Sequence, residues 1–150
     1  MTTRTRPVLI IVAIVPLAGA ALAYEIISTR PVREAVRVYT ELVTTGNRAD
    51  LADEQRLIGA RRLCSARYLA TGSLSLGPEG GIGGLPRTIN KNFQAWREGQ
   101  NVWICPTNRI GPVYQFVSEN GQWRFDGLIA ILRARGEIIR TTEMADPEAR

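Results

Sequence analysis

The chain contains few residues whose types and spacing could do catalytic chemistry. It has no histidine, which is the commonest general base and the commonest metal ligand in proteins. Cys64 and Cys105 stand too far apart for a C-x-x-C redox motif or a zinc knuckle. We therefore assign no catalytic residue, and we expect no metal and no cofactor.

The two cysteines have two interpretations. In an oxidising compartment Cys64 and Cys105 would form one disulfide, worth on the order of 3–4 kcal/mol. Alternatively, they are separate buried thiols that act as small hydrophobic side chains. Both interpretations stay open, because a bond requires the two Cα atoms to lie close together.

A glycine-rich stretch at residues 71–87 invites a phosphate-loop interpretation, which its details exclude. The run Gly77–Gly84 is not closed by Gly-Lys-Ser or Gly-Lys-Thr, and its spacing is not G-x-G-x-x-G. No helix start follows it. We expect a flexible connector here, or else a mobile flap over a pocket.

The formal net charge of +5 comes from 19 basic and 14 acidic residues. The basic residues are spread along the chain, and Arg61-Arg62 is the only adjacent pair. Domains that bind nucleic acid concentrate such residues on one face, usually with a readable motif. The composition therefore predicts a solvated, arginine-rich surface and no nucleic-acid partner.

The N-terminal segment predicts the compartment. Arg4 and Arg6 precede an uncharged, apolar run from Val8 to Tyr24, which a soluble helix would rarely contain. One interpretation is a single-pass membrane anchor of residues 8–27, with the N-terminus in the cytoplasm. The other is a signal peptide cleaved near Ala23, which would leave a secreted or periplasmic protein.

The anchor is favoured because apolar residues resume after Glu25. Either interpretation sends the rest of the chain out of the cytoplasm. We expect three parts: a signal anchor or signal peptide at residues 1–27, an extracytoplasmic domain at residues 28–135, and a flexible tail at residues 136–150.

The first half of the domain has the periodicity of helices. A stripe of apolar residues at helical spacing follows the helix-start signal at residues 28–31, and it consists of Ala35, Val36, Tyr39, Leu42 and Val43. We expect Gly59 to end a second helix, and residues 60–70 to form a third.

The second half alternates as strands do. We expect strands at residues 93–96 and 101–105, and a hairpin across residues 113–127 that turns at Asn120-Gly121. A type I′ turn would place Phe116 opposite Phe125. Side chains alternate along a strand, so Tyr114, Phe116, Trp123 and Phe125 would share one face.

Helices followed by a meander of antiparallel strands make an α+β layout. The sequence resembles the nuclear transport factor 2-like superfamily, a cystatin-like α+β roll, in residues 36–51, 63–69 and 120–127. The resemblance implies a cone-shaped roll, with N-terminal helices packed on a curved antiparallel sheet of about four strands. We expect the transmembrane or signal helix to precede this roll.

The resemblance also implies a cavity between the helices and the sheet. Six aromatic residues are expected to bind a ligand there: Tyr39, Tyr68, Tyr114, Phe116, Trp123 and Phe125. Isomerases of the family use a carboxylate or histidine base, and Asp126 is the one carboxylate expected within a strand. On the expected register Asp126 lies off the aromatic face, which favours a structural role.

Three functional hypotheses remain. The leading one is a non-enzymatic, membrane-tethered domain that binds a partner protein or a small apolar ligand. The resemblance also implies a possible homodimer through the sheet face, in which exposed Trp96, Trp103 or Trp123 could serve. The rival is an isomerase-like or dehydratase-like enzyme, which requires a raised pKa at Asp126 inside a pocket. The third is a purely structural envelope domain.

Overall fold

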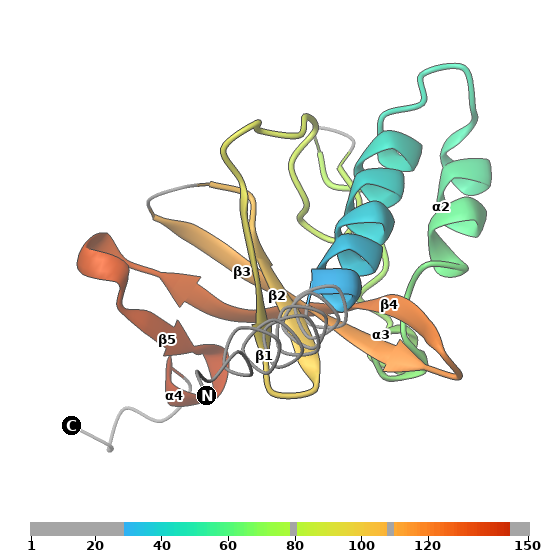
Figure 1. The fold of residues 1–150 in the computed structure, drawn as a ribbon. Coiled ribbons are helices and arrows are strands. Elements are labelled where there is room, and N and C mark those ends of the chain that lie inside the picture. Colours follow the sequence, from blue (N-terminus) through green and yellow to red (C-terminus); the bar gives the residue numbers. More distant parts are fainter. Residues whose placement is uncertain (1–28, 79–80, 108–109, 145–150) are drawn as a thin grey trace, which may run out of the picture.

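Alternating apolar residues in the second half of the chain form one curled antiparallel sheet. The structure is a computed structural model, and it describes residues 29–78, 81–107 and 110–144. Each strand pairs with the next along the chain, in the order β1-β2-β3-β4-β5 (Figure 1). The strands are β1 (Gln94–Glu98), β2 (Asn101–Cys105), β3 (Gly111–Glu119), β4 (Gln122–Leu132) and β5 (Ile138–Arg140).

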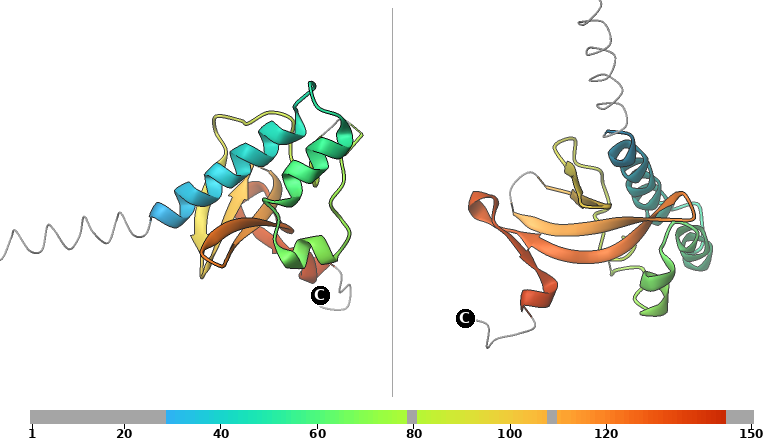
Figure 2. Two further views of the ribbon diagram at one scale, coloured as in Figure 1. Left: turned by 90° about the vertical axis from the view of Figure 1, so that its right-hand side faces the viewer. Right: turned by 60° about the horizontal axis from the view of Figure 1, so that its bottom comes forward.

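Helices precede and follow the sheet. Residues 29–46 are helical and are called the N-terminal helix below. The other helices are α2 (Asp53–Arg61), α3 (Ala66–Ala70), the 3₁₀ turn η1 (Ala134–Gly136) and α4 (Thr141–Met144). The N-terminal helix packs on the sheet, and α2 lies beside that helix (Figure 1 and Figure 2). The predicted α+β class is confirmed, with five strands among the described residues where about four were expected.

The N-terminal helix packs on the sheet through the predicted apolar stripe. Ala35, Tyr39 and Leu42 are inaccessible to solvent, and Val43 is 4% exposed. Val36 packs at the margin of the same cluster. Helical spacing alone was enough to identify the buried face.

The second helix does not end at Gly59. α2 continues through it to Arg61. A Cβ at Gly59 would lie only 3.1 Å from Cγ2 of Thr45, so the missing side chain lets α2 approach the N-terminal helix closely. The glycine serves helix packing rather than helix termination.

The predicted third helix is interrupted by a contact with the sheet. The N–H of Phe125 donates to the carbonyl of Leu63 at 2.8 Å, and the N–H of Ser65 donates to the carbonyl of Phe125 at 2.8 Å. Cys64 thereby forms a parallel bridge with Phe125. Residues 63–65 thus add a strand-like piece to the edge of β4, and only afterwards does α3 begin.

The central hairpin has the predicted turn and register. Asn120 and Gly121 have φ angles of 52° and 75°, as a type I′ turn requires. Phe116 lies opposite Phe125, as expected. Farther from the turn the register shifts, and Asp126 lies at a β-bulge without a directly opposite residue.

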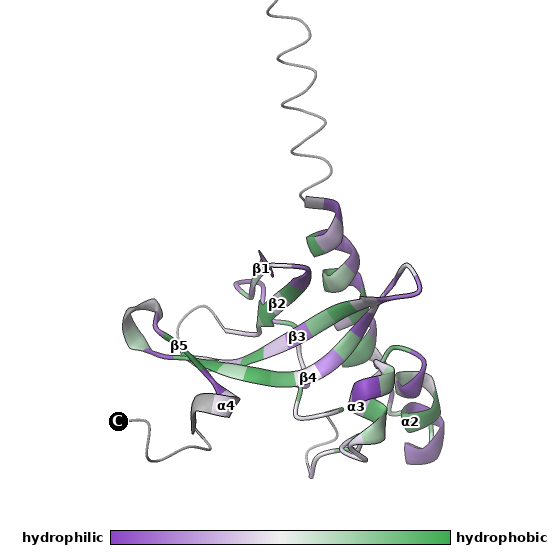
Figure 3. Cartoon of the chain, turned by 90° about the horizontal axis from the view of Figure 1, so that it is seen from below, coloured by the Kyte–Doolittle hydropathy of each residue, from purple (hydrophilic) through white to green (hydrophobic). Residues whose placement is uncertain are grey.

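The sheet separates two hydrophobic clusters. The helix-side cluster includes Val102 and Ile104 of β2 together with the aromatic residues of the hairpin. The far-side cluster consists of Trp103, Cys105, Val113, Ala130 and Leu132, and Arg140 lies over the Trp103 ring at 5.5 Å from its centroid. In Figure 3, β2 and the part of β4 farther from the turn are largely hydrophobic, whereas β1 and the hairpin tip are largely hydrophilic.

The two cysteines are free and buried. Cys64 belongs to the helix-side cluster and Cys105 to the far-side cluster. The structure therefore contains no disulfide between them, and it follows the alternative of two separate thiols.

The described part of the glycine-rich stretch is packed into the core. Ile82 is 1% exposed and Leu85 is 4% exposed. The hydroxyl of Tyr114 donates to the carbonyl of Gly84 at 2.8 Å. The expected connector or flap is therefore, at residues 81–85, a part of the helix-side cluster.

Ordered structure continues past residue 135, where the predicted domain ends. Ile138 and Ile139 pair with Leu132 and Ile131 in β4. Residues 138–144 form β5 and α4, which lie within the predicted tail. Two consecutive isoleucines were enough to extend the sheet by one short strand.

None of the helices within the described ranges is long and apolar enough to cross a membrane. The predicted anchor or signal at residues 1–27 lies outside the described residues. Its role stays a prediction from the sequence.

Gly83 provides a test of the packed glycine segment. Gly83 has a φ of 58°, and a Cβ there would lie 2.7 Å from the Tyr68 hydroxyl oxygen and 3.1 Å from the Phe125 ring. Gly72 has a φ of 68° and nothing within 4 Å. Gly72→Ala should lower the free energy of unfolding by about 1–2 kcal/mol through its backbone alone.

Gly83→Ala should lower the free energy of unfolding by about 1–3 kcal/mol more than Gly72→Ala does, because the added methyl overpacks the core. Denaturant unfolding of the two variants measures the difference. Equal losses would show that residues 81–85 do not pack as described.

Candidate functional site

Five of the six predicted ligand-binding residues are buried in the helix-side cluster. Tyr39, Phe116 and Phe125 are inaccessible, Tyr114 is 3% exposed, and Tyr68 is 8% exposed. Neighbouring rings pack at steep angles, with 4.9 Å between the centroids of Tyr68 and Phe125 and 5.6 Å between those of Phe116 and Phe125. Three surface pockets over the described residues are lined by side chains other than these five.

The hydroxyls of the buried tyrosines differ in their partners. Tyr68 donates to the carbonyl of Ser73 at 3.3 Å, and Tyr114 is bonded to Gly84. The Tyr39 hydroxyl is buried and has no hydrogen-bond partner among the described residues. Burial raises the pKa of Tyr39 and of Tyr114 to about 12, so both phenols are neutral at pH 7. A ligand-binding role for them stays a prediction.

Asp126 is buried among donors. Gln115 donates to its carboxylate at 2.9 Å, the Ser65 hydroxyl donates to it, and Arg67 forms an ion pair with it. Burial acts to raise the pKa of Asp126. The hydrogen bonds from Arg67, Ser65 and Gln115, together with the charge of Arg67, outweigh burial and hold this pKa below its usual value.

This arrangement is a structural clamp. Ser65 and Arg67 lie at the start of α3, so the carboxylate of Asp126 fastens α3 to β4. Gln115 in turn accepts a hydrogen bond from the indole N–H of Trp103 at 3.1 Å. The isomerase hypothesis required a raised pKa at Asp126, and the structure gives a lowered one.

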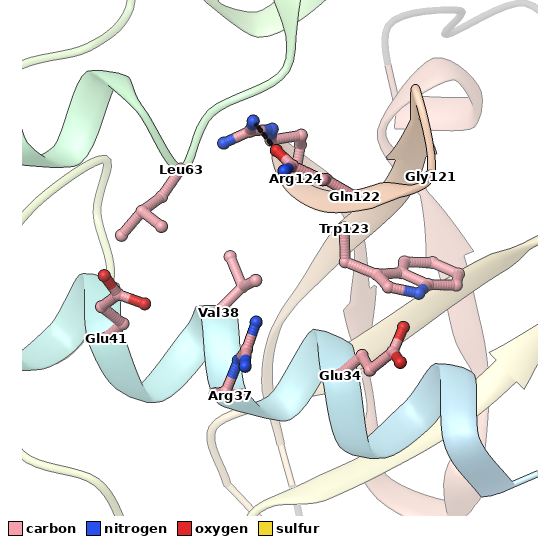
Figure 4. Close-up of a pocket in the computed structure, with 9 residues that line it drawn as sticks. All are labelled: Glu34, Arg37, Val38, Glu41, Leu63, Gly121, Gln122, Trp123 and Arg124. Atoms are coloured by element: carbon pink, nitrogen blue, oxygen red, sulfur yellow. Dashed lines mark hydrogen bonds between the residues drawn. The ribbon is translucent and has the colours of Figure 1, made fainter.

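A groove of about 260 Å³ lies between the N-terminal helix and the tip of the β3–β4 hairpin (Figure 4). We call it the hairpin groove. Val38, Leu63 and Trp123 supply its apolar surface. Its charged residues are Glu34, Arg37 and Glu41 of the N-terminal helix and Arg124 of β4.

Trp123 is the predicted ligand-binding residue that lies in this groove. Its side chain is half-buried, and it lines the groove together with Glu34. Arg30 Nε donates to the Glu34 carboxylate at 2.8 Å. The hydrogen bond from Arg30, together with the charge of Arg30, lowers the pKa of Glu34. The indole ring lies beside the Glu34 carboxylate, across from the N-terminal helix (Figure 4).

A shallow hollow of about 450 Å³ adjoins the groove, and Gln122 and Arg124 line both. Arg61 and Arg62, at the end of α2, line the hollow from the other side. We call it the arginine hollow. The groove and the hollow together form a continuous surface around the hairpin tip.

Trp123 was predicted from the sequence, but the charged residues around it were not. Glu34, Arg37 and Glu41 lie off the apolar stripe of their helix, and such residues usually belong to a solvated face. Nothing in their spacing indicates that a hairpin tip lies against them. The adjacent pair Arg61-Arg62 was the one visible signal, and the sequence alone did not connect it with Arg124.

The clamp makes stability depend on Asp126. Asp126→Asn should lower the free energy of unfolding at pH 7 by about 2–3 kcal/mol, because charged hydrogen bonds to Arg67 are lost. The control is Asp50→Asn, whose partner Arg48 is exposed, and it should cost less than about 1 kcal/mol.

The same clamp predicts a pH dependence. A carboxylate whose pKa is lowered in the folded state stabilises the fold fully above its unfolded pKa of about 4. This contribution is lost as the pH falls through the folded pKa. The difference between the wild type and Asp126→Asn should therefore shrink below about pH 4. A constant difference from pH 7 to pH 2 would contradict the clamp.

Comparison with known proteins gives no match for this chain. No family model matches it, and neither a curated protein nor a solved structure matches it significantly. The resemblance to the nuclear transport factor 2-like superfamily therefore rests on the sequence features named above.

Proposed function

We propose that this chain is a non-enzymatic domain, tethered to a membrane and exposed outside the cytoplasm, that binds a partner protein at the hairpin groove. The observation that carries the proposal is the position of Trp123. A large, half-buried aromatic ring lies beside the apolar surface of Val38 and Leu63 and within a charged rim. Aromatic side chains in such surroundings dominate the binding energy of many interfaces.

The distribution of polar groups supports a protein partner over a small apolar ligand. The buried aromatic rings pack on one another, and Ile82 and Leu85 complete their cluster. The hairpin groove instead presents acidic and basic side chains next to apolar ones. A peptide segment can match all three kinds of group at once, whereas an apolar small molecule would leave the charges without partners.

The other elements of the proposal rest on the sequence. The apolar run within residues 8–27 supports the tether. The α+β layout supports a scaffold of the nuclear transport factor 2-like type, with its cone-shaped roll. A homodimer through the sheet face stays a separate prediction; on that face Trp96 is half-buried and Trp103 lies beneath Arg140.

The tether predicts where the chain is found after cell fractionation. The full chain should stay with the membranes through an alkaline carbonate wash and keep its mass of 16.6 kDa. A version that begins at Ser28 should be soluble. A smaller mass, from loss of the first 23 residues, would identify a cleaved signal instead. A soluble chain of full mass in the cytoplasm would contradict both the membrane anchor and the cleaved signal peptide.

Site-specific photo-crosslinking tests the groove. A photoreactive amino acid at Gln122, which is exposed and lines the groove, should give a discrete adduct with one protein in native membranes. The same amino acid at Ile138, on the distant strand β5, is the matched control and should not give this adduct.

Trp123→Ala in the Gln122 version should remove the adduct, because the aromatic anchor is lost. Circular dichroism confirms that this variant remains folded. Identical adducts from Gln122 and Ile138, or an adduct that persists without the indole ring, would overturn the proposal.

A further inference from the structure

Three arginines from two separate elements line the arginine hollow. Arg61 and Arg62 come from the end of α2, and Arg124 comes from β4. Arginines at a helix C-terminus have an ordinary structural role, because they complement the partial negative charge of the last carbonyls. That role accounts for Arg61 and Arg62. It does not account for Arg124, which belongs to a strand and lines the same hollow.

The positive charge in the hollow is not neutralised within the described ranges. Among the described residues, ion pairs are formed by four other arginines, namely Arg30, Arg48, Arg56 and Arg67. Arg124 donates to the side-chain oxygen of Gln122. A guanidinium has five N–H donors, so this bond leaves most of the donors of Arg124 available.

The surroundings of Cys64 show that the arginines act on a common region. Cys64 lines the hollow and is 5% exposed. Burial raises the pKa of its thiol to about 12, while the charges of Arg124 and Arg61 act in the opposite direction. Both guanidinium groups therefore lie near enough to influence the same sulfur atom.

One acidic residue, Glu119, also lines the hollow. Its two carboxylate oxygens accept the backbone N–H of Ala66 at 3.2 and 3.1 Å. Its carboxylate is thus directed to the backbone at the start of α3. Three cations against one anion leave an excess of positive charge that an anionic ligand would neutralise.

We propose that the arginine hollow receives a carboxylate side chain of the partner protein, so that the hairpin surface selects an acidic peptide segment. This inference rests on the proposed function, because the hollow and the hairpin groove share Gln122 and Arg124. The partner segment places an apolar side chain against Trp123 and an acidic side chain among the arginines. Guanidinium groups bind carboxylates through paired hydrogen bonds.

The neighbouring charges favour a peptide over an anionic membrane surface or free phosphate. Glu34 and Glu41 line the adjoining groove, and Glu119 lines the hollow. A broad anionic surface would face all three carboxylates, which costs repulsion. A peptide is narrow enough to place one acidic side chain on the arginines and to keep the others away from the glutamates.

Fluorescence anisotropy on the full chain in neutral nanodiscs tests the inference. The probe is a fluorescein-labelled peptide of glutamate, serine and leucine, and its control has glutamine in place of glutamate. The test variant combines Arg62→Gln and Arg124→Gln. The control variant combines Arg97→Gln and Arg133→Gln, which removes the same charge from exposed positions elsewhere.

The glutamate peptide should bind saturably, and the glutamine peptide at least about tenfold more weakly. The test variant should weaken binding of the glutamate peptide at least about tenfold, and the control variant less than about twofold. Inorganic phosphate and glycerol 3-phosphate, each at the concentration of the peptide, should not displace the peptide.

Three results would overturn the inference: no saturable binding of the glutamate peptide below about 1 mM, equal binding of both peptides, or displacement by either phosphate compound. Trp123→Ala separates this failure from failure of the proposed function. If Trp123→Ala weakens binding and the arginine variant does not, the proposed binding at the hairpin groove is supported. The proposed recognition of an acidic side chain by the arginines is then wrong. If neither variant weakens binding, both fail.

Discussion

Two consecutive residues of β4, Phe125 and Asp126, connect the helices to the sheet. The backbone of Phe125 hydrogen-bonds to Leu63 and Ser65, and its ring is buried in the helix-side cluster. The next side chain, Asp126, points the other way because residues alternate along a strand. A buried carboxylate requires partners, and the start of α3 supplies them. The helical part of the domain is thus fixed to one position along one strand.

The candidate site is a consequence of this connection. Because residues 63–65 are bonded to β4, the end of α2 lies beside the hairpin tip. Leu63 then meets Val38 and Trp123 in the groove, and Arg61 and Arg62 line the same hollow as Arg124. Binding surface and fold therefore depend on the same few hydrogen bonds.

The parts predicted correctly from sequence are those with local causes. The Asn120-Gly121 turn determines the hairpin register, and helical spacing determines which face of the N-terminal helix is buried. The parts that were missed depend on residues distant in sequence. Gly59 lies inside α2, where its missing side chain leaves room for Thr45, and residues 63–65 pair with a strand about sixty positions away. No local pattern contains that information.

The same distinction applies to the site. Trp123 was selected because aromatic residues alternate along the hairpin, and this pattern is visible in the sequence. Glu34, Arg37 and Arg124 acquire their significance only from the approach of two elements. Asp126 combines both situations. Its position off the aromatic face was predicted from strand alternation, whereas its hydrogen-bond donors Ser65 and Arg67, which are distant in sequence, were not predicted.

We propose that a partner protein covers the hairpin groove in the native membrane. Cysteine accessibility measures this directly, since the native Cys64 and Cys105 are buried. In the Gln122→Cys variant, maleimide labelling should be several-fold slower in native membranes than in the purified chain. In the Ile138→Cys variant, the two labelling rates should be equal. Equal rates for both variants would contradict the account, because the groove would then be open where its partner is expected.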